Sequence, residues 1–352
     1  MSDKTNRGNF FEDFTLGQEI AHATPRTLTE GEVALYTGLY GGRFALNSAE
    51  TFALGLGYEG MPVDDFLVFH TVFGKTVPDI SLNAVANLGY AAGLFGEPVF
   101  PGDTLSATSK VIGLKENSNG QTGVVWVETR GVNQQDQMVL SYVRWVMVRK
   151  RDAAAPAPKA VVPDLPAAVA PEGFMVPLGL DMAGYDTTAS GSPHLWDDYA
   201  VGEKIDHVDG MTLEEAEHML ATRLYQNTAK VHFDAFAQKD SRFGKQLIYG
   251  GHIISLARGL SYNGLANAFR IAAINGGRHV APSFAGDTVY AWSEVLDKSA
   301  LPGRDDVGAL RLRLVAAKDH PCADFPLKDA DGRDHPAVLL DFDYWALMPR
   351  RA

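Results

Sequence analysis

Two long apolar segments, residues 66–73 and 253–260, occupy corresponding places in the two halves of the chain. In the second segment the apolar side chains recur at helical spacing, at Ile253, Leu256, Ala257 and Leu260. This spacing predicts a buried helix. Gly250 and Gly251 come directly before it, so the predicted helix begins at a pair of glycines.

Shorter helices and longer strands surround these two segments. Thr29 and Thr212 are candidate N-caps of short helices because acidic residues follow each of them in what would be the first turn. Further along, β-branched and aromatic residues predict strands at 122–130, 137–148 and 309–315, with a hairpin turn between the first two. The pattern therefore predicts an α+β fold in which an antiparallel sheet wraps around a central helix.

The order of elements recurs because the sequence itself repeats. FEDFTLGQEI, beginning at Phe11, corresponds to WDDYAVGEKI, beginning at Trp196, and we call the step between these two positions the repeat offset. FPGDTL, beginning at Phe100, corresponds to FAGDTV, beginning at Phe284, at an offset that is shorter by a single position. We interpret the chain as a tandem duplication.

The duplication divides the chain into two domains. The copies span residues 1–152 and 194–352, and a linker rich in proline and alanine, residues 153–193, joins them. Two domains also agree with the length of 352 residues, because a single hydrophobic core rarely grows that large.

Composition excludes several classes of function. The net charge of −12 argues against nucleic acid or an anionic membrane as the general partner, because binding phosphates needs a basic face. A single cysteine, Cys322, excludes an intramolecular disulfide and fits a reducing compartment. The polar N-terminal residues and the lack of a long apolar run complete the prediction of a cytoplasmic protein.

Candidate chemistry gathers in and after the segment 224–237. His232 and Asn227 lie five residues apart in it, and Gly250 and Gly251 follow within about twenty residues. A histidine can act as a base near neutral pH, and a glycine N–H at a helix N-terminus can stabilise a developing negative charge. The alternatives are a packed core histidine, and turn roles for Asn227 and the glycines.

Neither a metal nor a redox cofactor is expected. The histidines of the second half lack metal-ligand spacing, and no Gly-x-Gly-x-x-Gly motif follows a strand.

Taken together, these features resemble the MaoC-like, R-specific enoyl-CoA hydratases. The repeated opening, the Tyr225…His232-x-Asp234 segment, the glycine pair and the Phe-x-Gly-Asp-Thr strand entry all follow the order of that family. The resemblance implies a tandem double hotdog fold and reversible addition of water to an α,β-unsaturated acyl-CoA. It also implies that coenzyme A is present only as part of the substrate, and that the chain forms a homodimer or a higher homo-oligomer.

The resemblance also assigns roles within the second copy. His232 matches the histidine of the family and is the candidate general base. Asn227 stands where the family has an aspartate, and because an amide cannot act as a base, we expect Asn227 to orient the water. Gly251 is the candidate oxyanion donor and Gly250 a candidate substrate contact.

The first copy lacks these groups. By the repeat offset, Gly42 and Asn47 stand at the positions of Asn227 and His232. A register shift of one residue would place Ser48 at the position of His232 instead, and none of these residues is a base near neutral pH. We therefore expect the first copy to help hold the substrate while the second copy carries the chemistry.

The segment around His232 most resembles members of the family whose acyl chain carries a free carboxylate besides the thioester. The candidate cations for that carboxylate are Lys230, Arg43 and Arg278. The alternative for each of them is an ordinary charged residue at the surface. Tyr225 and Asp234 are further candidate substrate contacts, and Asp234 is alternatively a helix cap. Two rival functions remain, an acyl-CoA thioesterase that releases free coenzyme A and an acyl-CoA-binding protein without catalysis.

Overall fold

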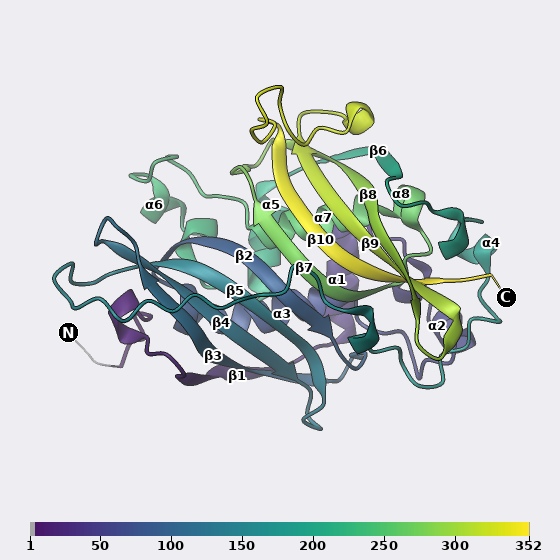
Figure 1. The fold of residues 1–352 in the computed structure, drawn as a ribbon, viewed down its shortest axis with the longest axis horizontal. Coiled ribbons are helices and arrows are strands. Elements are labelled where there is room, and N and C mark those ends of the chain that lie inside the picture. The colour runs from purple at the N-terminus through teal and green to yellow at the C-terminus, as the bar shows by residue number, and fades with distance from the viewer. Residues whose placement is uncertain (1–3, 352) are drawn as a thin grey trace.

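A computed structural model describes residues 4–351 of the chain, and its helices and strands follow the same order in both copies, except that the second copy has one further short helix before its last four strands (Figure 1). The first copy contains β1 (Glu19–Thr27), α1 (Glu30–Tyr40), α2 (Glu50–Gly55), α3 (Asp65–Thr76), β2 (Ala84–Phe95), β3 (Thr104–Glu116), β4 (Thr122–Val132) and β5 (Met138–Arg149). The second contains β6 (Lys204–Thr212), α5 (Glu215–Leu224), α6 (Ala235–Gln238), α7 (Gly250–Leu260), α8 (Tyr262–Leu265), β7 (Arg270–His279), β8 (Thr288–Leu301), β9 (Arg304–Lys318) and β10 (Val338–Pro349).

All of these strands form one antiparallel sheet in the order β1-β3-β4-β5-β2-β7-β10-β9-β8-β6. The first five belong to the first copy and the last five to the second, in mirrored order. The copies join where β2 pairs with β7, with Tyr90 opposite Gly277. The sheet is therefore continuous across the duplication, and the long helices lie on one of its faces (Figure 1).

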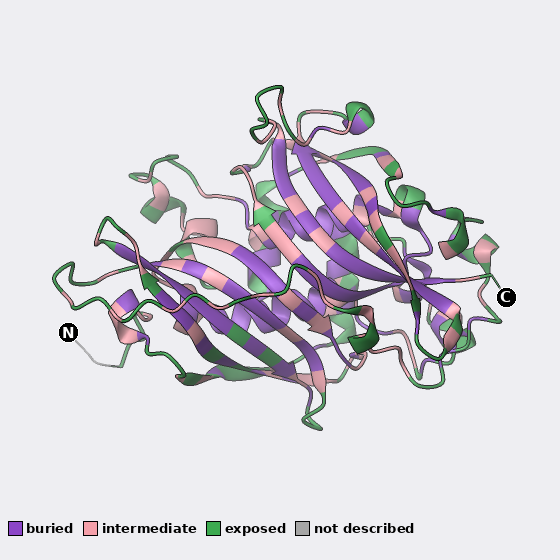
Figure 2. Cartoon of the chain, viewed as in Figure 1, coloured by how far each residue is buried: buried purple, intermediate pink, exposed green. Residues whose placement is uncertain are grey.

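The two long apolar segments form the predicted buried helices, α3 and α7. Every residue of α3 from Phe66 to Thr76 is buried, as is most of α7 (Figure 2). Both helices pack into a single hydrophobic core that takes residues from both halves of the sheet. The predicted strands are also confirmed, as β4, β5 and part of β9.

Residues related by the repeat offset bond to each other between the copies. The hydroxyls of Tyr40 and Tyr225 are 2.7 Å apart, and Nε2 of His70 is 2.9 Å from Oγ of Ser255. Both pairs are separated by 185 residues. A residue can touch its own counterpart only near a two-fold axis, so a pseudo-two-fold axis passes between α3 and α7.

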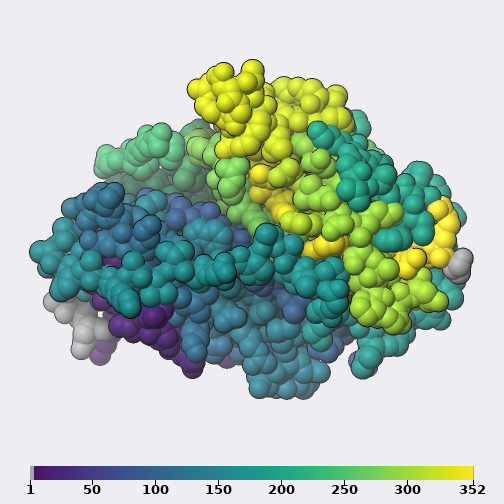
Figure 3. Space-filling view, in the orientation of Figure 1, coloured from purple at the N-terminus to yellow at the C-terminus, as the bar shows by residue number. Residues whose placement is uncertain are grey.

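The segment between β5 and β6 contains one short α-helix, α4 (Thr187–Ser190), besides two 3₁₀ turns, and runs over the outer face of the sheet (Figure 3). It is attached there by an isolated bridge between Val161 and Leu114 and by a bond from the N–H of Val169 to the Asn275 side chain, 2.8 Å long. Among residues 4–351, no helix is long and apolar enough to cross a membrane.

One of the two predicted helix caps is wrong. Thr29 caps α1, and its N–H bonds back to Glu32 at 2.7 Å. Thr212, in contrast, is the last residue of β6, where its hydroxyl lies 2.9 Å from that of Thr288. The N-cap of α5 is Glu214, because the strand pairing extends to Thr212 and delays the start of the helix.

Candidate active site

A cavity of about 350 Å³ lies between the two copies. The first copy contributes α3, the short π-helix after it (Val77–Ser81), and strands β2 and β5 to its wall. The second contributes the segment around His232, the N-terminus of α7 and the end of β7. The polar side chains of the lining come from both copies and include those of Tyr90, Arg144, Asn227, His232 and His279, and Gly250 contributes its backbone.

His232 lies on this wall at the end of a short 3₁₀ helix, Lys230–His232. Its Nδ1 is 3.1 Å from the carbonyl oxygen of Leu247. Because a carbonyl can only accept, Nδ1 carries the proton and Nε2 keeps a free lone pair. Burial lowers the pKa of His232 to about 4, so the imidazole is neutral near pH 7 and can accept a proton.

Asn227 also lies on the wall, and its two side-chain atoms have different surroundings. Its Oδ1 accepts a hydrogen bond from the N–H of Ala229 at 3.0 Å, which closes a tight turn before the histidine. Its Nδ2 makes no hydrogen bond to any residue in the described range 4–351. Asn227 is therefore a residue of the cavity wall with an unused donor.

The glycine pair opens α7, with Tyr249 as N-cap. The N–H of Tyr249 donates to Nε2 of His218 at 2.8 Å, whereas those of Gly250 and Gly251 have no acceptor among residues 4–351. Such orphan donors at the positive end of a helix favour negative charge.

Gly250 is the glycine that lines the cavity, and Gly251 is buried behind it. A Cβ at Gly250 would lie 2.3 Å from Cε1 of His279. Only glycine fits between the cavity and that ring.

Tyr225 lies behind the wall. Its hydroxyl contacts that of Tyr40, which in turn lies 2.9 Å from Nδ1 of His252. Burial lowers the pKa of His252 to about 4 and of His70 to about 3. Both are neutral core histidines, and their hydrogen bonds link the two copies beneath the cavity.

Three other predicted contacts lie outside the cavity lining. Asp234 caps α6, where its Oδ1 accepts from the N–H of Ala237 at 2.9 Å, so its alternative role as a helix cap is the observed one. Lys230 is exposed, next to the wall rather than on it. Arg43 is exposed as well, and its guanidinium stacks over the ring of Tyr262 at 4.5 Å.

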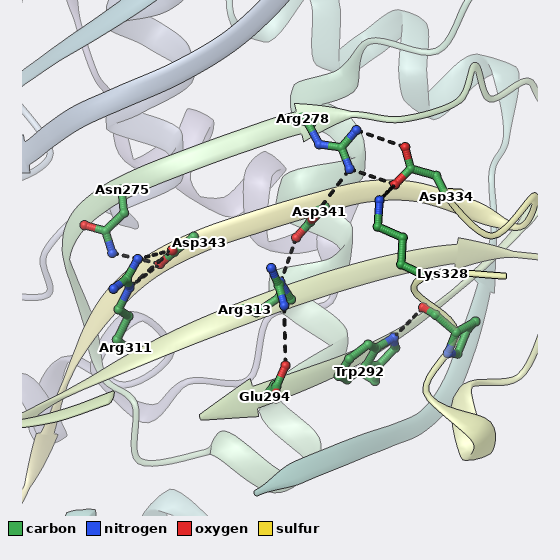
Figure 4. Close-up of polar contacts among 11 residues, drawn as sticks. Asn275, Arg278, Trp292, Glu294, Arg311, Arg313, Lys328, Asp334, Asp341 and Asp343 are labelled. Atoms are coloured by element: carbon green, nitrogen blue, oxygen red, sulfur yellow. Dashed lines mark hydrogen bonds and ion pairs between the residues drawn. The ribbon is translucent and has the colours of Figure 1, made fainter. Parts of the chain in front are cut away.

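Arg278 belongs to an ion-pair network on the outer face of the sheet (Figure 4). Its guanidinium lies 2.9 Å from Asp334 and 3.6 Å from Asp341, and its side chain is 49% exposed. Arg313 shares Asp341, and Lys328 shares Asp334. Arg278 therefore faces away from the cavity and is already paired.

The structure adds two groups to the cavity that the sequence did not single out. His279, next to Arg278 in β7, points inward with Nε2 3.2 Å from the hydroxyl of Tyr90, and burial lowers its pKa to about 4. Arg144, in β5, is fully buried and lines the cavity from the first copy. A charged residue in an otherwise apolar strand was the signal for Arg144.

The corresponding place in the first copy is filled. Asp65 occupies the position of Gly250, and its carboxylate lies 3.6 Å from Arg270. Asn47, at the position of His232, donates to the carbonyl of Pro62 at 3.0 Å. The space left there is about 10 Å³.

Comparison with known proteins identifies the family. The model of the mesaconyl-CoA hydratase family matches residues 1–325. The chain belongs to this family. The match confirms the hydratase resemblance of the sequence, and also the finer likeness to members whose acyl chain carries a free carboxylate besides the thioester.

Individual relatives cover the whole chain. The β-methylmalyl-CoA dehydratase of Chloroflexus aurantiacus is 68% identical over 351 residues, 100% of both chains. The mesaconyl-CoA hydratase of Cereibacter sphaeroides is 65% identical over 349 residues, 99% of this chain and 100% of the relative.

Two solved structures establish the fold. A MaoC domain protein dehydratase from Chloroflexus aurantiacus matches with a TM-score of 0.98 at 68% identity, and the match covers 100% of both chains. A double-hotdog protein of Mycobacterium tuberculosis matches with a TM-score of 0.76 at 25% identity, over 97% of this chain and 99% of that chain. The fold is the predicted α+β double hotdog.

Proposed function

We propose that the chain catalyses the reversible hydration of mesaconyl-CoA to β-methylmalyl-CoA. One observation carries the proposal beyond family membership. The cavity between the copies places a neutral imidazole, an unused amide donor and an unpaired helix N-terminal N–H on one wall. Hydration of an enoyl thioester needs a base, a group that orients water, and a site for the oxyanion.

In this proposal His232 acts as the general base. Its Nε2 removes a proton from water as the oxygen attacks the β-carbon, and Nδ1 keeps its bond to the Leu247 carbonyl, which fixes the ring. Nδ2 of Asn227 donates a hydrogen bond to the water. This bond orients the free lone pair of the water oxygen toward the substrate. The imidazolium then returns the proton to the α-carbon, so no second acid is required.

The negative charge that develops on the thioester oxygen is stabilised at the N-terminus of α7. Gly250 is the nearer donor because it lies on the cavity wall, and Gly251 is the second orphan N–H of the same turn. A donor of this kind contributes about 3 kcal/mol to transition-state stabilisation. The groups described use acid–base chemistry alone, so we propose no cofactor beyond the coenzyme A of the substrate.

The two copies divide the work. In the first copy the position of the base is Asn47 and the position of the cavity glycine is Asp65, which is paired with Arg270. We assign catalysis to the second copy and substrate binding in part to the first. The homo-oligomer implied by the resemblance stays a prediction.

Basic side chains near Phe243, which lines the cavity, suit the phosphates of coenzyme A. Lys239, Arg242 and Lys245 lie in the segment after α6, exposed or nearly so, and none pairs with a carboxylate within 4 Å among residues 4–351. In a chain of net charge −12 such a group is locally unusual, and we assign the phosphates to it.

The test follows the absorbance of the enoyl thioester when the protein is added to mesaconyl-CoA, together with a thiol assay. We expect loss of absorbance, no free thiol and an inactive His232→Gln variant. His320→Gln is the matched control, because His320 is a partly exposed histidine paired with Asp324, outside the cavity lining. Thiol release would assign the protein to the thioesterases. No change with any enoyl-CoA would indicate a binding role.

A further inference from the structure

Arg144 is a buried cation without a buried anion. Its side chain is fully buried, yet no carboxylate among residues 4–351 lies within 4 Å of it. Nη2 donates to Oγ1 of Thr76 at 2.7 Å, Ser81 is a weaker acceptor at 3.4 Å, and Nε has no partner. A guanidinium has five N–H donors, so its hydrogen-bonding capacity is only partly used.

A buried guanidinium with unused donors destabilises the protein unless an anion or further acceptors bind it. Burying a charge is strongly unfavourable when it is neither paired nor fully hydrogen-bonded. The ring of Phe73, 4.3 Å from the guanidinium carbon, offers a weak partner. Arginine stays protonated even when buried, so the charge remains. An anion entering the cavity that Arg144 lines would meet a charged donor already free of water.

The fold itself does not require a cation at this position. In the sheet Arg144 is opposite Val127, and in the second copy Tyr344 is opposite Leu312. Because Val127 and Leu312 are related by the repeat offset, Tyr344 is the counterpart of Arg144. A neutral aromatic residue therefore fills the same place in a copy with the same fold.

We propose that Arg144 is the specificity-determining residue that binds the free carboxylate of the acyl chain. The inference rests on the proposed function, which supplies an acyl chain with a carboxylate on the β-carbon. With the thioester oxygen at Gly250, the chain extends across the cavity from the second copy toward the first. Of the cations considered from the sequence, none lines this cavity, whereas Arg144 does.

The test compares ligands that differ only in the carboxylate. Methylsuccinyl-CoA carries it and 2-methylbutyryl-CoA replaces it with a methyl group, and neither can be hydrated, so Kd is measured directly by calorimetry. For Arg144→Met we expect Kd for methylsuccinyl-CoA to rise by about 30-fold or more. The Kd for 2-methylbutyryl-CoA should change little, and Arg144→Lys should restore part of the lost affinity. Arg278→Met, an arginine on the outer face of the sheet, should alter neither ligand.

Turnover supplies the second readout. In Arg144→Met, KM for mesaconyl-CoA should rise while hydration of 2-methylcrotonyl-CoA, its uncharged counterpart, is kept or improved. An equal loss with both ligands in a folded variant would make Arg144 structural and overturn the inference, as would unchanged binding of methylsuccinyl-CoA. Wild-type protein that fails to hydrate mesaconyl-CoA would instead refute the proposed function.

Discussion

Replacing Gly250 with alanine tests the geometry of the active-site wall. An added Cβ would lie 2.3 Å from Cε1, 2.5 Å from Nδ1 and 2.7 Å from Nε2 of His279. Non-bonded carbon atoms rest about 3.5 Å apart, so the ring or the first turn of α7 must retreat by about 1.2 Å. The ring is held by its 3.2 Å contact with the Tyr90 hydroxyl, and moving it breaks that contact.

Gly250→Ala is expected to affect folding stability less than it affects the rate of the reaction. Overpacking of this kind costs about 1–3 kcal/mol of folding stability. A shift of about 1 Å at a reacting centre costs about 100-fold in rate, because the substrate is no longer held in line with the base. Gly250→Ala should therefore fold, with a lowered Tm, and lose most of its kcat for mesaconyl-CoA.

The assay is the initial rate of enoyl-thioester absorbance loss, with Tm measured on the same preparations. Gly38→Ala is the control, because a Cβ at Gly38 in helix α1 has nothing within 4 Å. That variant should keep full activity and gain up to about 1 kcal/mol of stability from helix propensity. Full activity in Gly250→Ala would refute the assignment of this helix N-terminus to the oxyanion site.

Three further predictions concern charge. Burial lowers the pKa of His232 to about 4, and the base must be neutral to accept a proton. We therefore expect kcat/KM to be constant from about pH 8 to about pH 6 and to fall only toward pH 4. A fall in kcat/KM near pH 6.5 would contradict this. Asn227→Asp keeps the turn to Ala229 but adds a negative charge to the cavity, so it should raise KM about tenfold or more for mesaconyl-CoA and much less for crotonyl-CoA; equal effects on both substrates would argue against an anionic acyl chain. Several buried histidines are neutral when folded, with pKa values near 3 or 4 against 6.5 unfolded, so the unfolded chain binds more protons below pH 6.5. The free energy of unfolding, measured by urea titration, should be highest above about pH 6.5 and decline toward pH 4. The decline should reach up to about 1.4 kcal/mol per pH unit for each histidine, and a constant free energy of unfolding would contradict the prediction. These histidines are His70, His207, His218, His252 and His279.

Much of the fold could be predicted from the sequence, because apolar spacing and the repeat report on local structure. The buried helices α3 and α7 and the hairpin of β4 and β5 follow from that spacing. The misplaced cap at Thr212 shows the limit of a local pattern. Applied consistently, the repeat offset from Thr29 points to Glu214, the observed N-cap.

The site could be predicted only in part, because two of its groups depend on packing between the copies. The segment around His232 supplies Asn227 and the histidine from nearby positions, so sequence proximity was informative. Adjacent residues in a strand point to opposite faces, so Arg278 pairs outside the sheet while His279 faces the cavity. Choosing between them needed the orientation of β7, which the sequence did not provide.

The duplication explains how one cavity can hold a base from one copy and an unpaired cation from the other. In a symmetric dimer of single hotdogs, both cavities would be built from identical residues, and a glycine at the position of Gly250 would also stand at the position of Asp65. Within one chain the two copies differ: Gly250 against Asp65, His232 against Asn47, and Arg144 against Tyr344. The first two differences remove the base and the glycine from the unused cavity. The third replaces the arginine with a neutral residue in the copy where no substrate carboxylate would pair with it. One cavity is thereby kept open at about 350 Å³, and the other is closed by an ion pair between Asp65 of the first copy and Arg270 of the second.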